Sequence, residues 1–221
     1  MEKNTLIVIP TYNEINSLKL IISKIHKKYN LLVIDDFSND GTKTFLKKKN
    51  VNFIRNKKNE GYEKTVLKGL KYAHNKKFKY VLTFDSDGEH NVDDIPRLIK
   101  RIKFKNCDLV IANRNRKNRA TEILLSFISQ LKYKVLDPVS GLKIYNVNKL
   151  NKLNKIDYYT QKKLYLTNIV IYFINKEYQI DNINVVSKKR SDRSKVGGLF
   201  LTNIKIFYIA LIFLFNSFNF K

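Results

Sequence analysis

Short apolar runs alternate with segments of helical periodicity through the first half of the chain. The runs have the length of buried strands and cover 5–9, 31–35, 51–55, 80–84 and 108–112. The segments between them repeat apolar residues at helical spacing, which predicts helices over 15–28, 42–49, 62–76 and 93–104. This alternation indicates an α/β fold built on a mostly parallel sheet. Because no Pro/Gly/Ser-rich linker divides the chain, we predict a single domain for this part.

Polar motifs follow four of the predicted strands. They are PTYNE at 10–14, DDFSNDGT at 35–42, DSDGEH at 85–90 and ANR at 112–114. Right-handed crossovers place the carboxyl ends of parallel strands at one edge of the sheet, so the four motifs should meet there. Asp85 and Asp87 stand at i and i+2 on a turn, where both carboxylates can bind one hard cation. The sequence therefore predicts a site for Mg²⁺ or Mn²⁺ and a diphosphate at this edge.

Other well-known nucleotide and metal motifs are absent from the sequence. It has no GxxxxGK(S/T) phosphate loop, no GxGxxG after the first strand, no zinc-type Cys/His cluster and no GxSxG elbow. Its single cysteine, Cys107, excludes an internal disulfide, indicates a reducing compartment and is typical of a small buried side chain. No charged region followed by a long apolar run opens the sequence, so we expect no signal peptide.

The formal net charge of +24 has two interpretations. It indicates an anionic partner, such as a membrane surface, a phosphorylated ligand or nucleic acid. Only eight of the 43 basic residues are arginine, so the charge also fits the lysine bias of an AT-rich coding sequence. A nucleic-acid-binding protein is the remote alternative, because the chain lacks aromatic residues interleaved with basic ones and its acidic motifs would repel phosphates. We expect no nucleic-acid partner.

The ordered motifs, followed by DPVSGLKIYN at 137–146, resemble family 2 glycosyltransferases of the GT-A fold. Within that family the chain is similar to dolichol-phosphate mannosyltransferases and bacterial polyprenyl-phosphate sugar transferases. The resemblance implies a Rossmann-like, mostly parallel sheet flanked by helices, with residues 1–196 as the GT-A domain. It also implies a metal-dependent inverting enzyme that transfers a hexose from GDP-mannose or UDP-glucose type donors to a polyprenyl or dolichyl phosphate.

Each motif that matches the family implies a role for particular residues of this chain. The resemblance places Pro10, Tyr12, Glu14, Ile34 and Asp36 around the base and ribose of the nucleotide. It places Asp85, Ser86 and Asp87 on the metal and the diphosphate of the sugar nucleotide.

The second half of the chain supplies the remaining implied contacts. Arg114 matches an arginine that holds phosphate, and the resemblance implies that Asp137, Ser140 and Gly141 form the acceptor-side turn. In IDNINVVSKKRSDRSK, Arg190, Ser194 and Lys195 match residues that grip the donor phosphates when a loop closes. The resemblance thus implies a catalytic group of Asp85, Asp87, Arg114 and Asp137.

Departures from the family pattern are concentrated in the last third of the chain. Asn168 replaces a glutamate, Asn182 and Asn184 replace a Glu-x-Pro, and the loop between Arg190 and Lys195 is one residue short. An earlier departure is Glu63, where the family has a second glycine.

The absence of one family motif indicates which acceptor to expect. Family members with hydroxyl acceptors usually carry a Glu-Asp pair after the DxD motif as general base, and none is found here. A lipid phosphate is already anionic and needs positioning rather than a base. Lipid phosphate is therefore the expected acceptor, and transfer to a saccharide hydroxyl of a cell-surface glycan is the alternative.

The end of the chain is apolar. Residues 206–215 form an uninterrupted apolar run of ten, short of the roughly 20 that span a bilayer. We expect 197–221 to be a helix that lies in a membrane interface, with a core helix as the alternative. The expected location is cytoplasmic, peripheral at the inner face of a membrane. His90, which follows the DxD motif, is either a neighbour of the metal site or a loop histidine.

Overall fold

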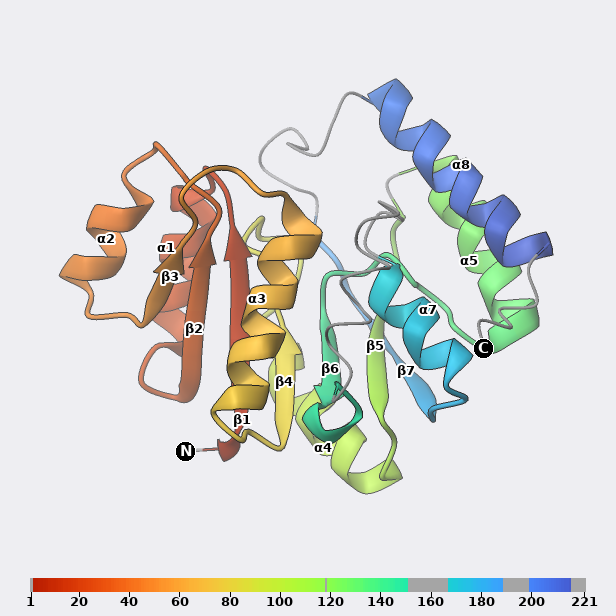
Figure 1. Ribbon diagram of the computed structural model, residues 1–221, viewed down its shortest axis with the longest axis horizontal. Helices are drawn as coiled ribbons and strands as arrows, with labels where there is room; N and C mark the ends of the chain where they lie inside the picture. The colour runs from red at the N-terminus through yellow and green to blue at the C-terminus, as the bar shows by residue number, and fades with distance from the viewer. Residues whose placement is uncertain (1, 118, 151–166, 189–198, 216–221) are drawn as a thin grey trace.

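The computed structural model describes residues 2–117, 119–150, 167–188 and 199–215. Its centre is a seven-stranded sheet in the order β3-β2-β1-β4-β6-β5-β7 (Figure 1). The strands are β1 (Glu2–Thr11), β2 (Tyr29–Asp35), β3 (Phe53–Arg55), β4 (Tyr80–Thr83), β5 (Leu109–Arg114), β6 (Lys143–Asn146) and β7 (Ile180–Val185). All neighbouring strands are parallel except β6, which is antiparallel to β4 and β5. The predicted α/β fold is confirmed.

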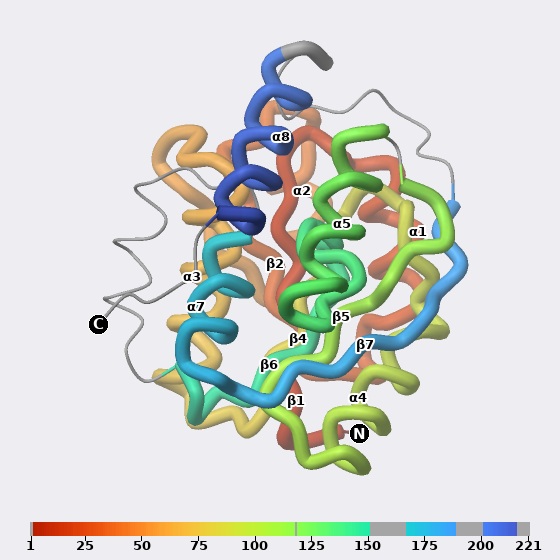
Figure 2. The backbone as a smooth tube through the Cα atoms, turned by 90° about the vertical axis from the view of Figure 1, so that its right-hand side faces the viewer, coloured from red at the N-terminus to blue at the C-terminus, as the bar shows by residue number. Residues whose placement is uncertain are grey.

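Helices cover both faces of the sheet (Figures 1 and 2). They are α1 (Ile15–Ile25), α2 (Thr42–Lys48), α3 (Tyr62–Asn75), α4 (Asp94–Lys105), α5 (Ala120–Tyr133), α7 (Asn168–Asn175) and α8 (Leu199–Phe215), with a 3₁₀ turn η1 (Val147–Leu150). Successive strand residues point to opposite faces. Accordingly Ile7 packs in the core beneath α1 and α4, whereas Leu6 packs in the core beneath α3 and α7. Burial on both faces explains why the strands read as continuous apolar runs.

Two local predictions need correction. PTYNE and ANR were each expected to follow a strand, but β1 continues to Thr11 and β5 to Arg114. The first two residues of PTYNE and all of ANR therefore form the carboxyl ends of the strands themselves. The antiparallel strand β6 was not predicted, because it lies inside the segment 137–146 that was interpreted only as an acceptor-side turn. The four predicted helices are present, with ends that differ from the expected ones by up to three residues.

Helix α8 lies along α5 at one end of the molecule (Figure 2). Thr121 donates a hydrogen bond of 2.8 Å to Asn203 near the start of both helices, and Lys132 reaches the carbonyl of Leu214 near their ends. One face of α8, which includes Ile206 and Phe213, is buried against α5, while other apolar residues of α8 are exposed. The helix therefore has one face packed in the core, as a core helix would, and exposed apolar residues, as a helix in a membrane interface would. Among the described helices, none has the length and apolar character needed to cross a bilayer.

Candidate active site

The loops that follow β1 and β2 are joined to each other by hydrogen bonds. The backbone amide of Asn13 donates to the hydroxyl of Ser38 at 2.9 Å, and the amide of Ile15 donates to the carboxylate of Asp40 at 2.9 Å. Because the second contact lies at the first residue of α1, Asp40 also supplies an acceptor for that helix start. The two motifs therefore form one surface at the carboxyl edge of the sheet.

The DxD turn after β4 is fixed to the same surface through Ser86. Ser86 is 1% exposed, and its hydroxyl contacts the carbonyl of Pro10 at 2.9 Å and the carboxylate of Glu14. The structure thus brings together Pro10, Glu14 and Ser86, which the sequence placed in one site. Through these two contacts, Ser86 fixes the orientation of the DxD turn.

Asp85 and Asp87 each accept a hydrogen bond from the protein. The hydroxyl of Tyr62 donates to Asp85 at 2.7 Å, and the backbone amide of Glu89 donates to Asp87 at 2.9 Å. Burial, with a further contribution from Asp85, raises the pKa of Tyr62 well above its usual value, so its hydroxyl remains a donor at neutral pH. Each carboxylate is thus oriented by a donor from the protein.

The two carboxylates fit a hard divalent cation. The described part of the chain holds no cluster of three or more His, Cys, Asp or Glu residues able to enclose a metal. Mg²⁺ is commonly held by one or two carboxylates, with water and substrate phosphates completing the coordination. Asp85 and Asp87 would therefore supply the protein ligands of such an ion, through oxygen atoms only.

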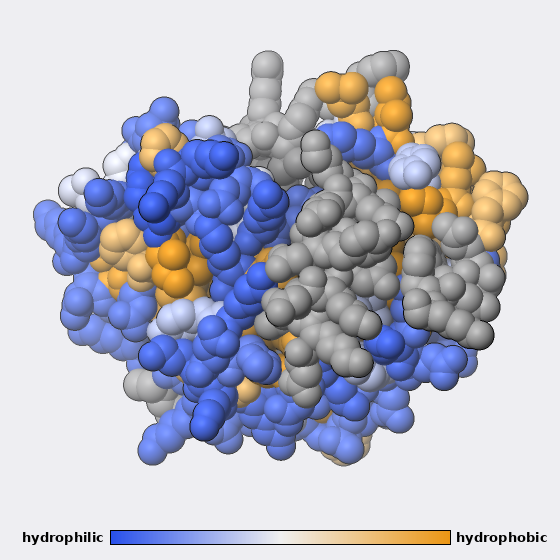
Figure 3. All heavy atoms as spheres, in the orientation of Figure 1, coloured by the Kyte–Doolittle hydropathy of each residue, from blue (hydrophilic) through white to orange (hydrophobic). Residues whose placement is uncertain are grey.

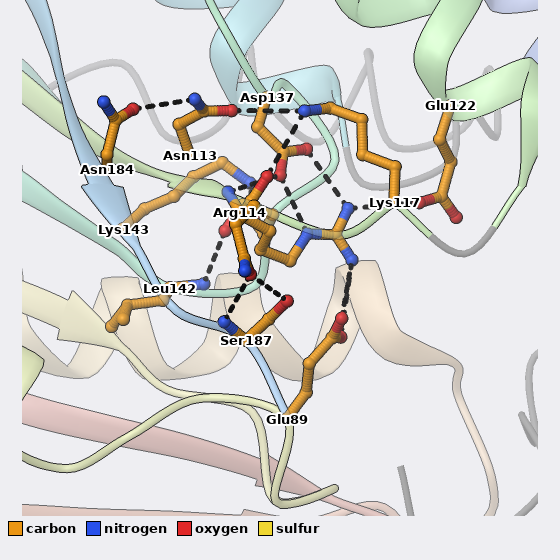
Figure 4. Close-up of polar contacts among 12 residues, drawn as sticks. Glu89, Asn113, Arg114, Lys117, Glu122, Asp137, Leu142, Lys143, Asn184 and Ser187 are labelled. Carbon is orange, nitrogen blue, oxygen red and sulfur yellow. Dashed lines mark hydrogen bonds and ion pairs between the residues drawn. The ribbon is translucent and has the colours of Figure 1, made fainter. Parts of the chain in front are cut away.

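A second cluster lies beside the DxD turn and is centred on Arg114 (Figure 4). The guanidinium is 6% exposed and contacts Asp137 at 2.8 Å, Glu122 at 3.2 Å and Glu89 at 3.3 Å. Burial alone would lower the pKa of Arg114, but the three carboxylates outweigh it and raise the pKa above its usual value. Arg114 is therefore a permanently charged centre that compensates three buried carboxylates. Its predicted contact with phosphate stays a prediction.

Lys143 on β6 is a further buried charge in this region. Its ammonium group donates to the carbonyl of Ser140, inside the predicted acceptor-side turn. Burial lowers the pKa of Lys143 to about 8, while the nearby carboxylates of Asp137 and Asp85 oppose that shift. Lys143 and Tyr62 line a small cavity together with Asn168, whose buried amide has no hydrogen-bond partner among the described residues.

The predicted nucleotide contacts occupy different environments. Tyr12 is 36% exposed, whereas the side chain of Ile34 lies within the core. Asp36 accepts hydrogen bonds from the side chain of Asn56 at 2.6 Å and from the backbone amides of Glu60 and Gly61, just before α3, at 2.8 and 2.9 Å. In this structure Asp36 therefore holds the loop between β3 and α3, and its contact with base or ribose stays a prediction.

Three predicted site residues and one histidine remain. Arg190, Ser194 and Lys195 lie outside the described residues. His90 is 4% exposed, packs edge-on against the ring of Phe84, and has no hydrogen-bond partner for either ring nitrogen among the described residues. Burial lowers the pKa of His90 to about 4, so the ring is neutral at neutral pH.

Comparison with known families agrees with this geometry. The family model described as glycosyl transferase family 2 matches residues 6–164. This chain belongs to glycosyl transferase family 2. The matched residues include the three loops after β1, β2 and β4, the Arg114 cluster and the acceptor-side turn.

Several curated proteins are similar to this family 2 chain. An uncharacterized protein of Methanocaldococcus jannaschii is 36% identical over 119 residues, which are 50% of this chain and 52% of that protein. The UDP-N-acetylglucosamine–dolichyl-phosphate N-acetylglucosaminyltransferase of Methanococcus voltae is 28% identical over 70% of this chain and 74% of its own length. The dolichol-phosphate mannosyltransferase of Pyrococcus furiosus is 31% identical over 61% of this chain and 44% of its own length. The chain thus spans about half the length of the first of these relatives.

Solved structures share the fold. The glucosyl-3-phosphoglycerate synthase of Mycobacterium tuberculosis, in complex with Mn²⁺, UDP and glucosyl-3-phosphoglycerate, superposes with a TM-score of 0.71. The match covers 95% of this chain and 78% of that one at 16% identity. At this identity the likeness supports the GT-A fold alone.

Sequence reasoning missed four residues of this candidate site. They are Tyr62, Glu89, Glu122 and Lys143. Glu89 carried a signal, because it follows Asp87 at the same spacing of two that separates the aspartates. The other three lie at least 23 residues from the DxD motif, on α3, α5 and β6, and only the tertiary fold brings them to it.

Replacing Gly141 by alanine is expected to weaken metal binding at the DxD turn. A Cβ at this position would lie 1.7 Å from a carboxylate oxygen of Asp85, so Asp85 would have to move. We expect the affinity for Mn²⁺ in the presence of nucleoside diphosphate to fall about tenfold or more, measured by calorimetry, because a ligand about 1 Å out of place is costly.

Gly41→Ala is the control for this substitution. Gly41 also has a positive φ, of +88°, and a Cβ there would come no closer than 3.5 Å to the side chain of Ile15. An alanine at this position should therefore be strained and lower stability without displacing Asp85. Equal Mn²⁺ affinity in Gly141→Ala and the unmodified protein would contradict the assigned contact.

Proposed function

We propose that this protein transfers a hexose from a nucleotide-diphosphate sugar to a polyprenyl or dolichyl phosphate, with Mg²⁺ or Mn²⁺ bound at Asp85 and Asp87. The observation that carries the proposal is the placement of these two carboxylates on the surface formed by the loops after β1 and β2. Relatives named as polyprenyl- or dolichyl-phosphate sugar transferases support the choice of substrates.

The donor side rests on the residues around the DxD turn. Asp85 and Asp87 would hold the ion, and Ser86 and Tyr62 keep the turn and the Asp85 carboxylate in place. A bound divalent ion would neutralise negative charge on the departing nucleoside diphosphate. Arg190 and Lys195, which lie outside the described residues, are proposed to add positive charge to the same phosphates.

The acceptor side favours a phosphate over a hydroxyl. A general base must reach the proton it removes, but the carboxylate of Asp137 is fully buried and accepts three hydrogen bonds from Arg114. Asp137 is therefore proposed to position Arg114 and the acceptor-side turn rather than to accept a proton. A phosphate acceptor, already anionic, requires only correct positioning next to the sugar.

An exposed apolar surface supports an acceptor that resides in a membrane. We define the α5–α8 apolar surface as the exposed apolar side chains of these two helices, and it appears as an orange region at the upper right of Figure 3. Its members are Ile123, Leu124, Phe127, Leu131, Leu201, Ile204, Phe207, Tyr208, Leu214 and Phe215. The exposed lysines Lys132 and Lys205 lie on the same helices. Apolar side chains flanked by basic ones are typical of interfacial helices on anionic lipid.

Glutamate at both Phe127 and Leu131 is expected to reduce binding to anionic vesicles at least about tenfold. Each substitution removes apolar area that lipid would cover and adds a charge that anionic lipid repels. Phe127 is 61% and Leu131 69% exposed, so the fold should tolerate the change. Co-sedimentation with vesicles measures the effect. Leu20→Glu, at a position 68% exposed on α1, is the matched control. Equal loss in both variants would contradict the proposed membrane contact.

Calorimetric titration with GDP and with UDP in the presence of Mn²⁺ tests the donor site. We expect one of the two nucleotides to bind, and binding to disappear when Mn²⁺ is omitted. Absence of binding by both nucleotides, in protein shown to be folded by circular dichroism, would contradict the proposed function.

A further inference from the structure

Phe37 combines two unusual features at the carboxyl end of β2. Its backbone has a φ of +70°, in the left-handed region that a bulky side chain rarely adopts. Its side chain is 47% exposed, although an aromatic ring gains most from burial. Strained backbone of this kind persists where the surrounding structure holds it, and it is concentrated at functional sites.

The ring of Phe37 is held in place by its neighbour on β3. The guanidinium of Arg55 lies 5.0 Å from the ring centroid, within the range of a cation–π contact. Arg55 is itself fixed, because it donates to the carboxylate of Asp35 at 2.6 Å and to the carbonyl of Ser38 at 2.8 Å. Asp35 is fully buried and also accepts from the amide of Ser38 at 2.9 Å. We call Phe37 and Arg55 the Phe37–Arg55 platform.

The platform lies at a suitable distance from the proposed diphosphate site. In the sheet β1 separates β2, which ends at the platform, from β4, which leads to Asp85 and Asp87. Adjacent strands are about 4.8 Å apart, so the two strand ends are separated by about 10 Å across the sheet. A ribose and its first phosphate can bridge such a gap. The loop after β1 lies between them and is bonded to Ser38 through Asn13 and to Ser86 through Glu14.

We propose that the Phe37–Arg55 platform stacks against the nucleobase of the donor and contributes directly to nucleotide affinity. This inference rests on the proposed function, because it assumes a nucleoside diphosphate with its phosphates at the DxD turn. Every nucleobase has a flat π-face, and an exposed aromatic ring on a rigid support is the side chain that binds it. The strained backbone at Phe37 presents the ring outward at this edge.

Phe37→Gly separates a binding role from a structural one. Glycine adopts a positive φ without strain, so the variant should unfold at the same temperature as the unmodified protein or a higher one. If the ring stacks on the base, affinity for GDP or UDP with Mn²⁺ should fall about tenfold to a hundredfold. Affinity for pyrophosphate with Mn²⁺ should stay unchanged, because pyrophosphate has no base. Phe37→Tyr, which keeps the ring, should retain most of the nucleotide affinity.

Phe104→Ala is the matched control. Phe104 is 76% exposed and carries Lys105 at 5.7 Å from its ring centroid, but it lies near the end of α4, away from the motif loops. Its substitution should leave nucleotide affinity unchanged. Unchanged nucleotide affinity in Phe37→Gly, or an equal loss for pyrophosphate, would overturn the stacking role. If the unmodified protein binds pyrophosphate with Mn²⁺ but neither nucleotide, the platform assignment fails while the metal site stands. If it binds none of the three, the proposed function itself fails.

Discussion

Asp87→Asn is expected to lower the rate of sugar transfer about a hundredfold to a thousandfold while leaving the fold intact. The substitution removes one of two carboxylates proposed to hold the divalent ion, and such an ion supplies several kcal/mol of transition-state stabilisation. Asparagine retains an oxygen that can accept the 2.9 Å hydrogen bond from the amide of Glu89, so the turn should keep its shape. Steady-state kinetics at saturating donor measures the loss.

Asp93→Asn serves as the control for this substitution, because Asp93 is exposed just before α4 and belongs to no proposed site. Its rate should equal that of the unmodified protein. Full activity in Asp87→Asn would contradict the role of the DxD turn. A parallel loss of thermal stability would instead assign Asp87 a structural role.

Arg114→Met is expected to destabilise the protein by about 3–5 kcal/mol. The substitution removes the guanidinium that contacts Glu89, Glu122 and Asp137. Arg119 still contacts Glu122 at 2.6 Å, but the loss of the central positive charge from a buried group of carboxylates is strongly unfavourable. Chemical denaturation at neutral pH measures the change in the free energy of unfolding. The free energy of unfolding of Arg114→Lys should lie between those of Arg114→Met and the unmodified protein. Lysine keeps the positive charge but lacks the planar group that contacts all three carboxylates.

Lys103→Met tests whether that loss is specific to the buried cluster. The side chains of Lys103 and Glu2 are 42% and 32% exposed in their ion pair, so removal of the lysine charge should cost no more than about 1 kcal/mol. Similar losses in Lys103→Met and Arg114→Met would contradict the interpretation that Arg114 compensates a buried set of carboxylates.

Local sequence patterns predict much of this fold. The strands β1, β2 and β4 are apolar on both faces because helices cover both sides of the sheet, and that produces the runs seen in the sequence. The polar motifs after these strands then follow from topology, since parallel strands present their carboxyl ends at one edge. The interlocked loops after β1 and β2 and the DxD turn confirm that the motifs meet there.

Features that depend on contacts between residues distant in the sequence cannot be predicted from local patterns. Strand β6 is only four residues long and antiparallel, so the expected alternation of strands and helices gives no sign of it. In the sequence, Glu122 is an ordinary acidic residue of the first turn of α5. Its contact with Arg114 arises only because the fold brings α5 beside the end of β5. Similarly, nothing in the sequence indicates that Lys143 is buried, because lysine is common throughout this chain.

Phe37 illustrates a third case, in which the sequence shows the residue but not its conformation. It stands within DDFSNDGT, where the pattern identifies the loop yet gives no sign of a left-handed backbone or an exposed ring. The contact with Arg55 joins residues 18 positions apart, one just after β2 and the other at the end of β3, and the β2–β3 pairing brings them together.

Formation of a glycosylated lipid phosphate tests the central claim most directly. The purified protein would be incubated with Mn²⁺, a polyprenyl phosphate in detergent, and GDP-mannose or a UDP-hexose labelled in the sugar, and the lipid extract would be analysed by mass spectrometry. The proposed function predicts a polyprenyl monophosphate that carries one hexose, dependent on Mn²⁺ and lost in Asp87→Asn. Transfer to a saccharide hydroxyl with the lipid phosphate inert, or no transfer from any donor by folded protein, would contradict it.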